Sequence, residues 1–335
     1  MKPLHLISHQ TNLPFLRIRM WTLGLTALLM IASVVAIAVH GFEFGVDFRG
    51  GSVLEIRTKE VPDLSRMRTN LAALNLGEVS LQQFGTTNDV LIKVPQQPGD
   101  ERAQLNAVNK VKETLGSDVD YRRVEFVGPQ VGAELIERGL IAMGLALVGI
   151  MFYVWFRFSW QYGVSALLTT IHDVVATAGL FALLKLEFNL TTVAALLTIA
   201  GYSINDTVVV FDRIRESMRR YKSLALPDLL NRAINDTLSR TVMTSVTTAL
   251  AVLSLFLFGG EVIRGFALAM LFGIVIGTYS SIFIATPILL WIPPDRTGED
   301  AKVAAAKASA AKTTPPASAR PKSEPASKPA SKPVG

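Results

Sequence analysis

An aspartate and an arginine in or beside long apolar stretches are the residues of this sequence best suited to chemistry. Asp206 lies late in the apolar stretch 190–211, and Arg240 immediately precedes the stretch 241–258. Arginine keeps its proton at ordinary pH, so only the carboxyl group of such a pair can titrate. Desolvation raises the pKa of a carboxyl group and a nearby guanidinium lowers it, so helix movements that part and rejoin the two would take up and release a proton. We therefore expect Asp206 and Arg240 to meet between their helices and to couple proton passage to motion.

Five other polar side chains lie in or beside the apolar stretches and are candidates for supporting this chemistry. They are His172, Asp173, Asn205, Thr244 and Thr247. Thr169, Asp173 and Thr177 recur every four residues and therefore share one helix face. Arg240, Thr244 and Thr247 share a face of a later helix in the same way. Polar groups are costly in hydrocarbon, so each must find an internal partner or a path of water.

Each of these residues also has a purely structural interpretation. Together with Arg213, Asp206 could be an interfacial cap whose charged ends reach the headgroups. Arg240 fits the excess of basic residues at the cytoplasmic ends of membrane helices. His172 and Asp173 could form a local hydrogen-bonded pair that fixes helix packing, and the hydroxyl stripe could hold helices together. Na⁺ would also suit an aspartate with nearby hydroxyl groups, so the residues alone leave the coupling ion open between a proton and Na⁺.

Several classes of enzyme lack their motifs in this chain. The sequence contains no G-x-x-x-x-G-K-[ST] phosphate-binding loop and no H-E-x-x-H zinc motif. The flanks of Asp173 and Asp206 do not resemble those of intramembrane aspartyl proteases, which need two carboxyl groups that share a proton. The absence of cysteine removes disulfides, thiolate metal sites and thiol catalysis. We expect no enzymatic activity and no bound cofactor or metal.

Six apolar stretches must position these polar residues. Half of the 335 residues are apolar, and they gather in stretches of roughly 17–27 residues, long enough to cross a hydrocarbon layer of ~30 Å. The stretches cover 20–40, 139–156, 164–184, 190–211, 241–258 and 265–291. The first contains Ala36-Ile37-Ala38, which fits a signal-peptide cleavage site, but it is longer than a signal core of ~7–15 residues. We expect it to remain as an uncleaved anchor.

Basic residues in the short connecting segments predict the orientation. The second stretch is followed by Arg157, and the fourth by a cluster made of Arg213, Arg215, Arg219, Arg220, Lys222, Arg232 and Arg240, whereas the segments after the third and fifth carry only Lys185 and Arg264. The positive-inside rule then places both termini in the cytoplasm and the long hydrophilic segment outside. The formal charge of +6 therefore indicates topology rather than nucleic-acid binding. The segment 1–19 is the expected cytoplasmic N-terminus, and 293–335, rich in Ala, Lys, Pro and Ser, is an expected disordered cytoplasmic tail.

The hydrophilic segment 41–138 reads as one small periplasmic domain. Alternation and turn residues predict, in order, a strand at 52–57, a helix at 62–74, strands at 78–84 and 89–94, a helix from 99 to 115 capped by Asp100, and a strand at 120–127. This βαββαβ order predicts a ferredoxin-like α+β domain. The sequence as a whole therefore predicts an α-helical integral membrane protein with six transmembrane helices, of which 139–292 holds the last five, and one periplasmic domain.

Five motifs follow one another along the chain. They are Gly45-Val46-Asp47-Phe48-Arg49-Gly50-Gly51, Val127-Gly128-Pro129-Gln130-Val131-Gly132-Ala133-Glu134-Leu135, His172-Asp173, the run 201–216 around Asn205-Asp206, and Ser239-Arg240-Thr241. The first is similar to G-x-D-F-x-G-G and the second to V-G-P-x-V-G-x-E-L. Through these motifs, residues 15–292 resemble the SecF members of the SecD/SecF protein-export family, within the RND superfamily. We expect the glycine motif to form a turn out of the membrane and Glu134 to anchor the return.

This resemblance implies a role in protein export. SecF-like proteins pair with SecD in a twelve-helix unit of the bacterial inner membrane, on the outer side of the SecYEG channel. The unit uses the proton gradient to help draw preproteins across, and YajC is a further expected partner, besides membrane lipid. The family's proton-pathway aspartate falls on Asp206 and its membrane arginine on Arg240, while another acidic group would come from SecD.

Two other functions remain open from the sequence. An RND-type efflux half-transporter for small molecules would need a larger outer domain than the ~90 residues present here, because it must enclose a substrate pocket. A non-transporting assembly subunit would use the intramembrane charges only to pair with SecD.

Overall fold

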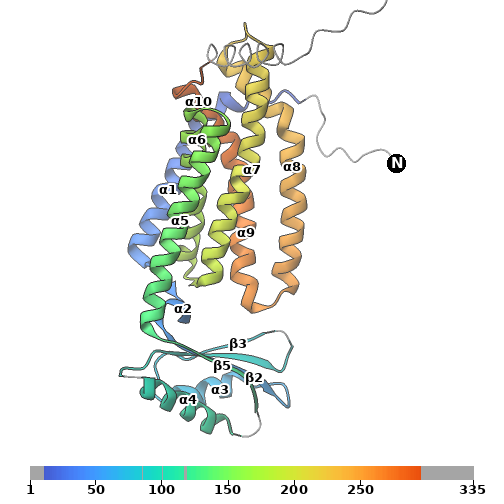
Figure 1. Ribbon diagram of the computed structural model, residues 1–335. Coiled ribbons are helices and arrows are strands. Elements are labelled where there is room, and N and C mark those ends of the chain that lie inside the picture. Colours follow the sequence, from blue (N-terminus) through green and yellow to red (C-terminus); the bar gives the residue numbers. More distant parts are fainter. Residues whose placement is uncertain (1–10, 85, 100, 117–118, 296–335) are drawn as a thin grey trace, which may run out of the picture. The chain divides into compact units, whose positions relative to one another are not determined.

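The computed structural model describes residues 11–84, 86–99, 101–116 and 119–295, and six of its helices are long and apolar enough to cross a membrane (Figure 1). They are α1 (Arg19–His40), α5 (Pro129–Arg157), α6 (Trp160–Leu184), α7 (Leu190–Arg220), α8 (Leu226–Phe258) and α9 (Glu261–Ser280), which continues through a π-helical turn, η3 (Ser281–Ala285), into α10 (Thr286–Trp291). A short 3-10 helix, η1 (Phe15–Ile18), precedes α1. The chain is a multi-pass membrane protein, as predicted; nearly all of the predicted disordered tail lies outside the described residues.

Several helices extend well beyond the apolar stretches that predicted them. α5 begins at Pro129 rather than at 139, α7 continues to Arg220 rather than ending at 211, and α8 begins at Leu226 rather than at 241. The predicted ranges marked apolar side chains only, whereas backbone hydrogen bonding continues after the side chains turn polar. Proline in the first turn suits the early starts of α5 and α8, because N–H donors have no intrahelical partner there.

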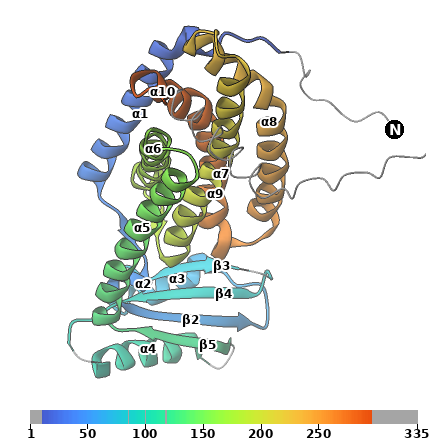
Figure 2. The ribbon, with the colours of Figure 1, turned by 45° about the horizontal axis from the view of Figure 1, so that its top comes forward.

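Helices α6, α7 and α9 form the buried centre of the membrane part, with α1, α5 and α8 around them (Figures 1 and 2). About half of the apolar window of each central helix is buried, against 6% for α5 and α8. Small residues let the helices approach closely: a side-chain carbon added at Gly273 of α9 would lie 2.4 Å from Ile199 of α7. One added at Gly179 of α6 would lie 2.4 Å from Ser33 of α1. The outer faces of α5 and α8 are left for lipid or for another protein.

The extramembrane domain has the predicted βαββαβ order. Its elements are β2 (Gly51–Thr58), α3 (Leu64–Ala72), β3 (Ser80–Gln83), β4 (Asp89–Pro95), α4 (Glu101–Leu115) and β5 (Val119–Val127). The strands form one antiparallel sheet in the order β3-β4-β2-β5. Both helices lie on one face of the sheet (Figure 2), where they bury Leu54 of β2 and Ile92 of β4. This is the ferredoxin-like arrangement.

The first helix of this domain begins at an aspartate cap. The side chain of Asp63 accepts hydrogen bonds from the N–H groups of Ser65 and Arg66, each at 3.0 Å. These bonds satisfy donors that have no partner within the helix. The helix therefore starts at Leu64, two residues later than the expected Pro62. The expected cap of the second helix, Asp100, lies outside the described residues.

The glycine motif after α1 forms a short helix, α2 (Val46–Arg49), rather than a simple turn. Gly50 follows it with φ +78°, a conformation that favours glycine. Beside it, β1 (Glu43–Phe44) pairs in parallel with β6 (Glu187–Phe188), from the loop between α6 and α7. The Oδ2 atom of Asp47 accepts a hydrogen bond from the N–H of Leu190 at 3.0 Å and so caps the start of α7. The motif therefore joins the exit of α1 to the entry of α7.

The second motif packs against the first. A side-chain carbon added at Gly132 of α5 would lie 2.3 Å from the carbonyl oxygen of Phe48 in α2, so only glycine allows this approach. Glu134, expected to anchor the return into the membrane, forms an exposed ion pair with Arg138 of the same helix at 3.8 Å. The two motifs thus meet through backbone contact.

Gly132→Ala should lower thermal stability, whereas Gly144→Ala in the same helix should not. The methyl group at position 132 would collide with the Phe48 carbonyl, and overpacking of this kind costs about 1–3 kcal/mol. At position 144 nothing lies within 4 Å, and alanine favours the helix by about 1 kcal/mol. Thermal unfolding of both variants in detergent, followed by circular dichroism, tests this; equal midpoints would contradict the α2–α5 contact.

The ion pair between Arg57 and Asp89 should make the sheet sensitive to acid. Arg57 of β2 donates to Asp89 of β4 at 2.5 and 2.7 Å, and these bonds hold the pKa of Asp89 well below its usual range. The resulting stability is fully present above the unfolded pKa of ~3.9 and is lost as the pH falls toward the folded value. Asp89→Asn should therefore increase hydrogen exchange of β2 and β4 at neutral pH and weaken its dependence on acid. An unchanged exchange profile would argue against the pair.

Candidate functional site

Two carboxyl groups lie buried among the membrane helices. Asp173 of α6 has no exposed surface, and Asp206 of α7 is 8% exposed. A carboxyl group in hydrocarbon is costly unless other groups of the protein hydrogen-bond to it. The partners of each one therefore define what it can do.

Asp173 has partners on three helices. Its Oδ1 atom lies 2.9 Å from Nδ1 of the adjacent His172. Its Oδ2 atom accepts hydrogen bonds from Ser203 of α7 at 2.5 Å and from Ser280 of α9 at 2.7 Å. Nε2 of His172 is buried and has no partner among the described residues. This centre ties α6, α7 and α9 together.

Asp206 is held by two hydroxyl groups. Thr241 of α8 donates to its Oδ1 atom at 2.7 Å, and Ser281, the first residue of η3, donates to its Oδ2 atom at 2.7 Å. All three residues are buried. Asp206 therefore links α7 both to α8 and to the π-helical turn.

The expected contact between Asp206 and Arg240 is absent. Within the described part of the chain no ion pair joins them, and the side chain of Arg240 is exposed. Successive residues of an α-helix point about 100° apart, and it is Thr241, the next residue, that faces Asp206. Helical spacing shows which residues share a face but not which face turns inward, so the sequence did not single out Thr241 as the partner of Asp206. The role expected of Arg240 stays a prediction.

The remaining predicted residues lie on the outer surface of the helices. Asn205 of α7 and both Thr244 and Thr247 of α8 are exposed. The two threonine hydroxyls bond to carbonyl groups of their own helix. Together with Arg240 they are exposed polar residues of two neighbouring membrane helices, and we name this set the α7–α8 polar face. Such a face is costly against lipid.

Four residues of the two carboxyl centres were missed in the sequence. They are Ser203, Thr241, Ser280 and Ser281. Each is a hydroxyl residue within a membrane helix, which was the available signal. Hydroxyl groups in helices commonly bond to a carbonyl one turn earlier, so the sequence could not tell which of them reach across to another helix.

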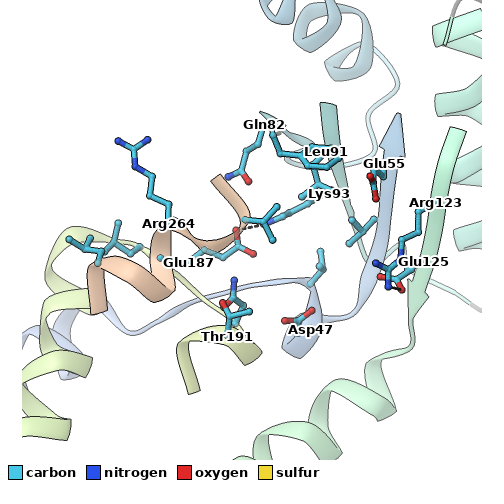
Figure 3. Close-up of a pocket in the computed structure, with 18 of the residues that line it drawn as sticks. Asp47, Glu55, Gln82, Leu91, Lys93, Arg123, Glu125, Glu187, Thr191 and Arg264 are labelled. Atoms are coloured by element: carbon cyan, nitrogen blue, oxygen red, sulfur yellow. Dashed lines mark hydrogen bonds and ion pairs between the residues drawn. The ribbon is translucent and has the colours of Figure 1, made fainter. Parts of the chain in front are cut away.

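A polar cavity lies away from the two carboxyl centres. It has a volume of about 770 Å³ and lies between the uncovered face of the sheet and the adjoining ends of α7 and α9 (Figure 3). Its charged residues are largely paired: Lys93 of β4 bonds to Glu187 of β6, and Arg123 to Glu125 within β5. The described residues include no cluster that could hold a metal ion. We interpret the cavity as the space that remains where the domain meets the membrane helices.

Comparisons with known proteins identify the same family as the sequence motifs. The C-terminal region of the SecD/SecF protein-export membrane proteins matches residues 107–295, and the SecD/SecF GG motif matches residues 35–60. Protein translocase subunit SecF of Rickettsia bellii (strain OSU 85-389) is 44% identical over 291 residues, which cover 86% of this chain and 95% of the relative. The SecF subunit of Rickettsia prowazekii (strain Madrid E) is 43% identical and covers 86% and 93% in the same way.

Two solved structures are similar over most of the chain. The crystal structure of SecDF, a translocon-associated membrane protein from Thermus thermophilus, gives a TM-score of 0.73 at 37% identity and covers 86% of this chain. SecDF in its super-membrane-facing form gives a TM-score of 0.65 at 34% identity and covers 93%. The match spans 39% and 41% of those two chains.

Removal of the Asp173 carboxyl group should destabilise the protein much more than removal of an exposed one. Asp173→Ala leaves His172 and the Ser203 hydroxyl without this acceptor, at about 1–3 kcal/mol for each unsatisfied group. Asp212→Ala removes an exposed pair with Arg157, which is worth about 0–1 kcal/mol. Thermal unfolding in detergent compares the two; similar losses of stability would show that the Asp173 centre does not hold the helices together.

Proposed function

The chain belongs to the SecD/SecF family of protein-export membrane proteins, and we propose that it acts as a SecF subunit that couples the proton motive force to preprotein movement through the Sec channel. The observation that carries this proposal is the buried carboxyl group of Asp206, whose hydrogen-bond partners among the described residues are the hydroxyl groups of Thr241 and Ser281. The role requires binding, release and motion but no covalent chemistry.

Asp206 is suited to take up and release a proton because both of its partners adapt to either state. A hydroxyl group donates to a carboxylate and accepts from a carboxylic acid, so Thr241 and Ser281 can satisfy the charged and the neutral form. A permanent arginine partner would instead favour the charged form. Each elementary charge that follows the membrane potential supplies roughly 2.3 kcal/mol per 100 mV. Reversal of the hydrogen bonds at Asp206 would alter contacts of α7 with α8 and with η3.

The α7–α8 polar face supports pairing with a separate SecD subunit. The guanidinium of Arg240 and the amide of Asn205 lie on the outside of membrane helices and need cover from a polar surface, whereas the two threonine hydroxyls bond to their own helix. The match to the solved SecDF chains spans only 39% of one and 41% of the other, so those proteins extend well beyond the matched part. We assign a SecD half to this face, with an acidic group opposite Arg240. Movement of the two halves would then bring Arg240 nearer to Asp206 or to that acid.

Basic residues support the proposed location in the bacterial inner membrane. The end of α7 and the start of α8 carry a basic cluster made of Arg213, Arg215, Arg219, Arg220 and Arg232. Basic residues of short loops favour the cytoplasmic side. Both termini would then be cytoplasmic, and the extramembrane domain would lie in the periplasm, where a preprotein leaves SecYEG.

Asp206→Asn should stop proton-driven export while leaving the complex assembled. Vesicles containing SecYEG, SecD and this chain would receive an imposed proton gradient in Na⁺-free buffer. Internal pH would report proton entry, and protease protection would report preprotein export. We expect both gradient-dependent rates to fall roughly 10²-fold, the usual cost of removing a proton-transfer group.

Asp212→Asn is the matched control, because Asp212 lies on the same helix but is exposed and paired with Arg157. It should retain both rates. Undiminished proton entry in Asp206→Asn would overturn the proposed coupling. If that variant no longer copurified with SecD, its carboxyl group would serve assembly rather than transport. Activity that requires added Na⁺ would identify the other coupling ion.

A further inference from the structure

Two adjacent serines connect the two buried carboxyl groups. Ser280, the last residue of α9, donates to Asp173 of α6, and Ser281, the first residue of η3, donates to Asp206 of α7, each at 2.7 Å. Both serines are completely buried. Because neighbouring residues of a helix point about 100° apart, one short segment reaches two different helices at once.

Each serine hydroxyl also has an alternative acceptor on its own helix. The Ser280 hydroxyl lies 3.1 Å from the carbonyl oxygen of Gly277, and the Ser281 hydroxyl lies 3.0 Å from that of Thr278. A hydroxyl group has a single proton to donate. Ser281 can therefore give its proton to Asp206 or to the carbonyl of Thr278, and the choice depends on whether Asp206 can accept it.

Ser281 begins the π-helical turn η3 (Ser281–Ala285). Turns of this kind are rare inside α-helices and are frequent at functional sites. The turn is held at its far end by Ser165 of α6, whose hydroxyl donates to the carbonyl oxygen of Ala285 at 2.7 Å. Thr286 lies 3.3 Å from the carbonyl oxygen of Ser281. The turn is thus fixed to α6 at both ends, by Ser280 and by Ala285. A change in the hydrogen bonds of Ser281 therefore acts on a short turn whose two ends are held.

We propose that Ser281 is a positioning residue that transmits the protonation of Asp206 to the η3 turn, while Ser280, bound to Asp173, holds the turn against α6. When Asp206 is ionised, Ser281 donates to it across the helices. When Asp206 binds a proton, its O–H donates to the Ser281 oxygen, and Ser281 turns its own proton to the carbonyl of Thr278. Apart from the O–H bond that the arriving proton forms at Asp206, only hydrogen bonds form or break. The inference rests on the proposed function of Asp206.

The two centres differ in a way that suits these roles. Asp173 has three side-chain partners on three helices, including His172, whereas Asp206 has only two hydroxyl groups. Loss of one contact therefore leaves Asp173 in place but changes half of the partners of Asp206. Ser280 belongs to the fixed centre and Ser281 to the centre that changes.

The test compares Ser281→Ala, Ser281→Thr and Ser280→Ala in the vesicles with SecYEG and SecD. Ser254→Ala is the matched control, since the Ser254 hydroxyl bonds only to Leu250 of its own helix. We expect Ser281→Ala to reduce gradient-dependent export about tenfold, the effect of losing one hydrogen bond to an ionisable group. Ser281→Thr should restore most of the rate, because it keeps the hydroxyl group. Ser254→Ala should export at the unsubstituted rate.

Infrared spectroscopy separates transmission from simple packing. The carboxylic-acid C=O band that disappears in Asp206→Asn belongs to Asp206, and it should shift in Ser281→Ala but not in Ser280→Ala. Normal export and an unshifted band in Ser281→Ala would overturn the inference, as would failure of threonine to restore export. If the unsubstituted protein carried no protons at all, the proposed function itself would fail, and that outcome is distinct from the others.

Discussion

A carboxyl group inside a membrane has to be hydrogen-bonded by the helices that surround it, and this requirement governs the arrangement of α6, α7 and α9. Asp173 and Asp206 are both buried there and meet serine or threonine hydroxyls rather than guanidinium groups. Those hydroxyls reach across only because the helices are close, and Gly273 permits that approach. The buried acids and the small residues are therefore parts of one arrangement: each acid needs near neighbours, and glycine supplies the space for them.

The extramembrane domain and α2 are joined to the same helices by side-chain and backbone contacts. The helix α2 caps α7 with Asp47 and touches α5 where Gly132 leaves room for it. Lys93 of the sheet pairs with Glu187, in the loop that enters α7. The entry of α7 is therefore joined to β4, an inner strand of the sheet. These contacts would carry the movement that we propose for a proton bound at Asp206 to the domain outside the membrane.

Long patterns were predictable from the sequence and single contacts were not. Hydropathy gave the six helices, and alternation gave the four-stranded sheet, because both depend on many residues with one period. The two-residue strands β1 and β6 are too short to carry a pattern. At the site, the sequence identified Asp173 and Asp206 by their cost in hydrocarbon. It placed Arg240 rather than Thr241 against Asp206, because the direction of a helix face depends on packing that spacing does not encode. The sequence does not distinguish Ser280 and Ser281 from hydroxyl residues that bond only within their own membrane helix.

The account depends on a carboxyl group at position 206 that binds and releases a proton from within the helices. A hydrophobic carbodiimide, which modifies protonated carboxyl groups, tests this directly in vesicles that contain the complex, with the modified residue located by mass spectrometry. The account predicts that modification of Asp206 varies with the imposed proton gradient and that proton entry falls in proportion to the fraction modified. Proton entry that continues unchanged after complete modification of Asp206 would contradict it.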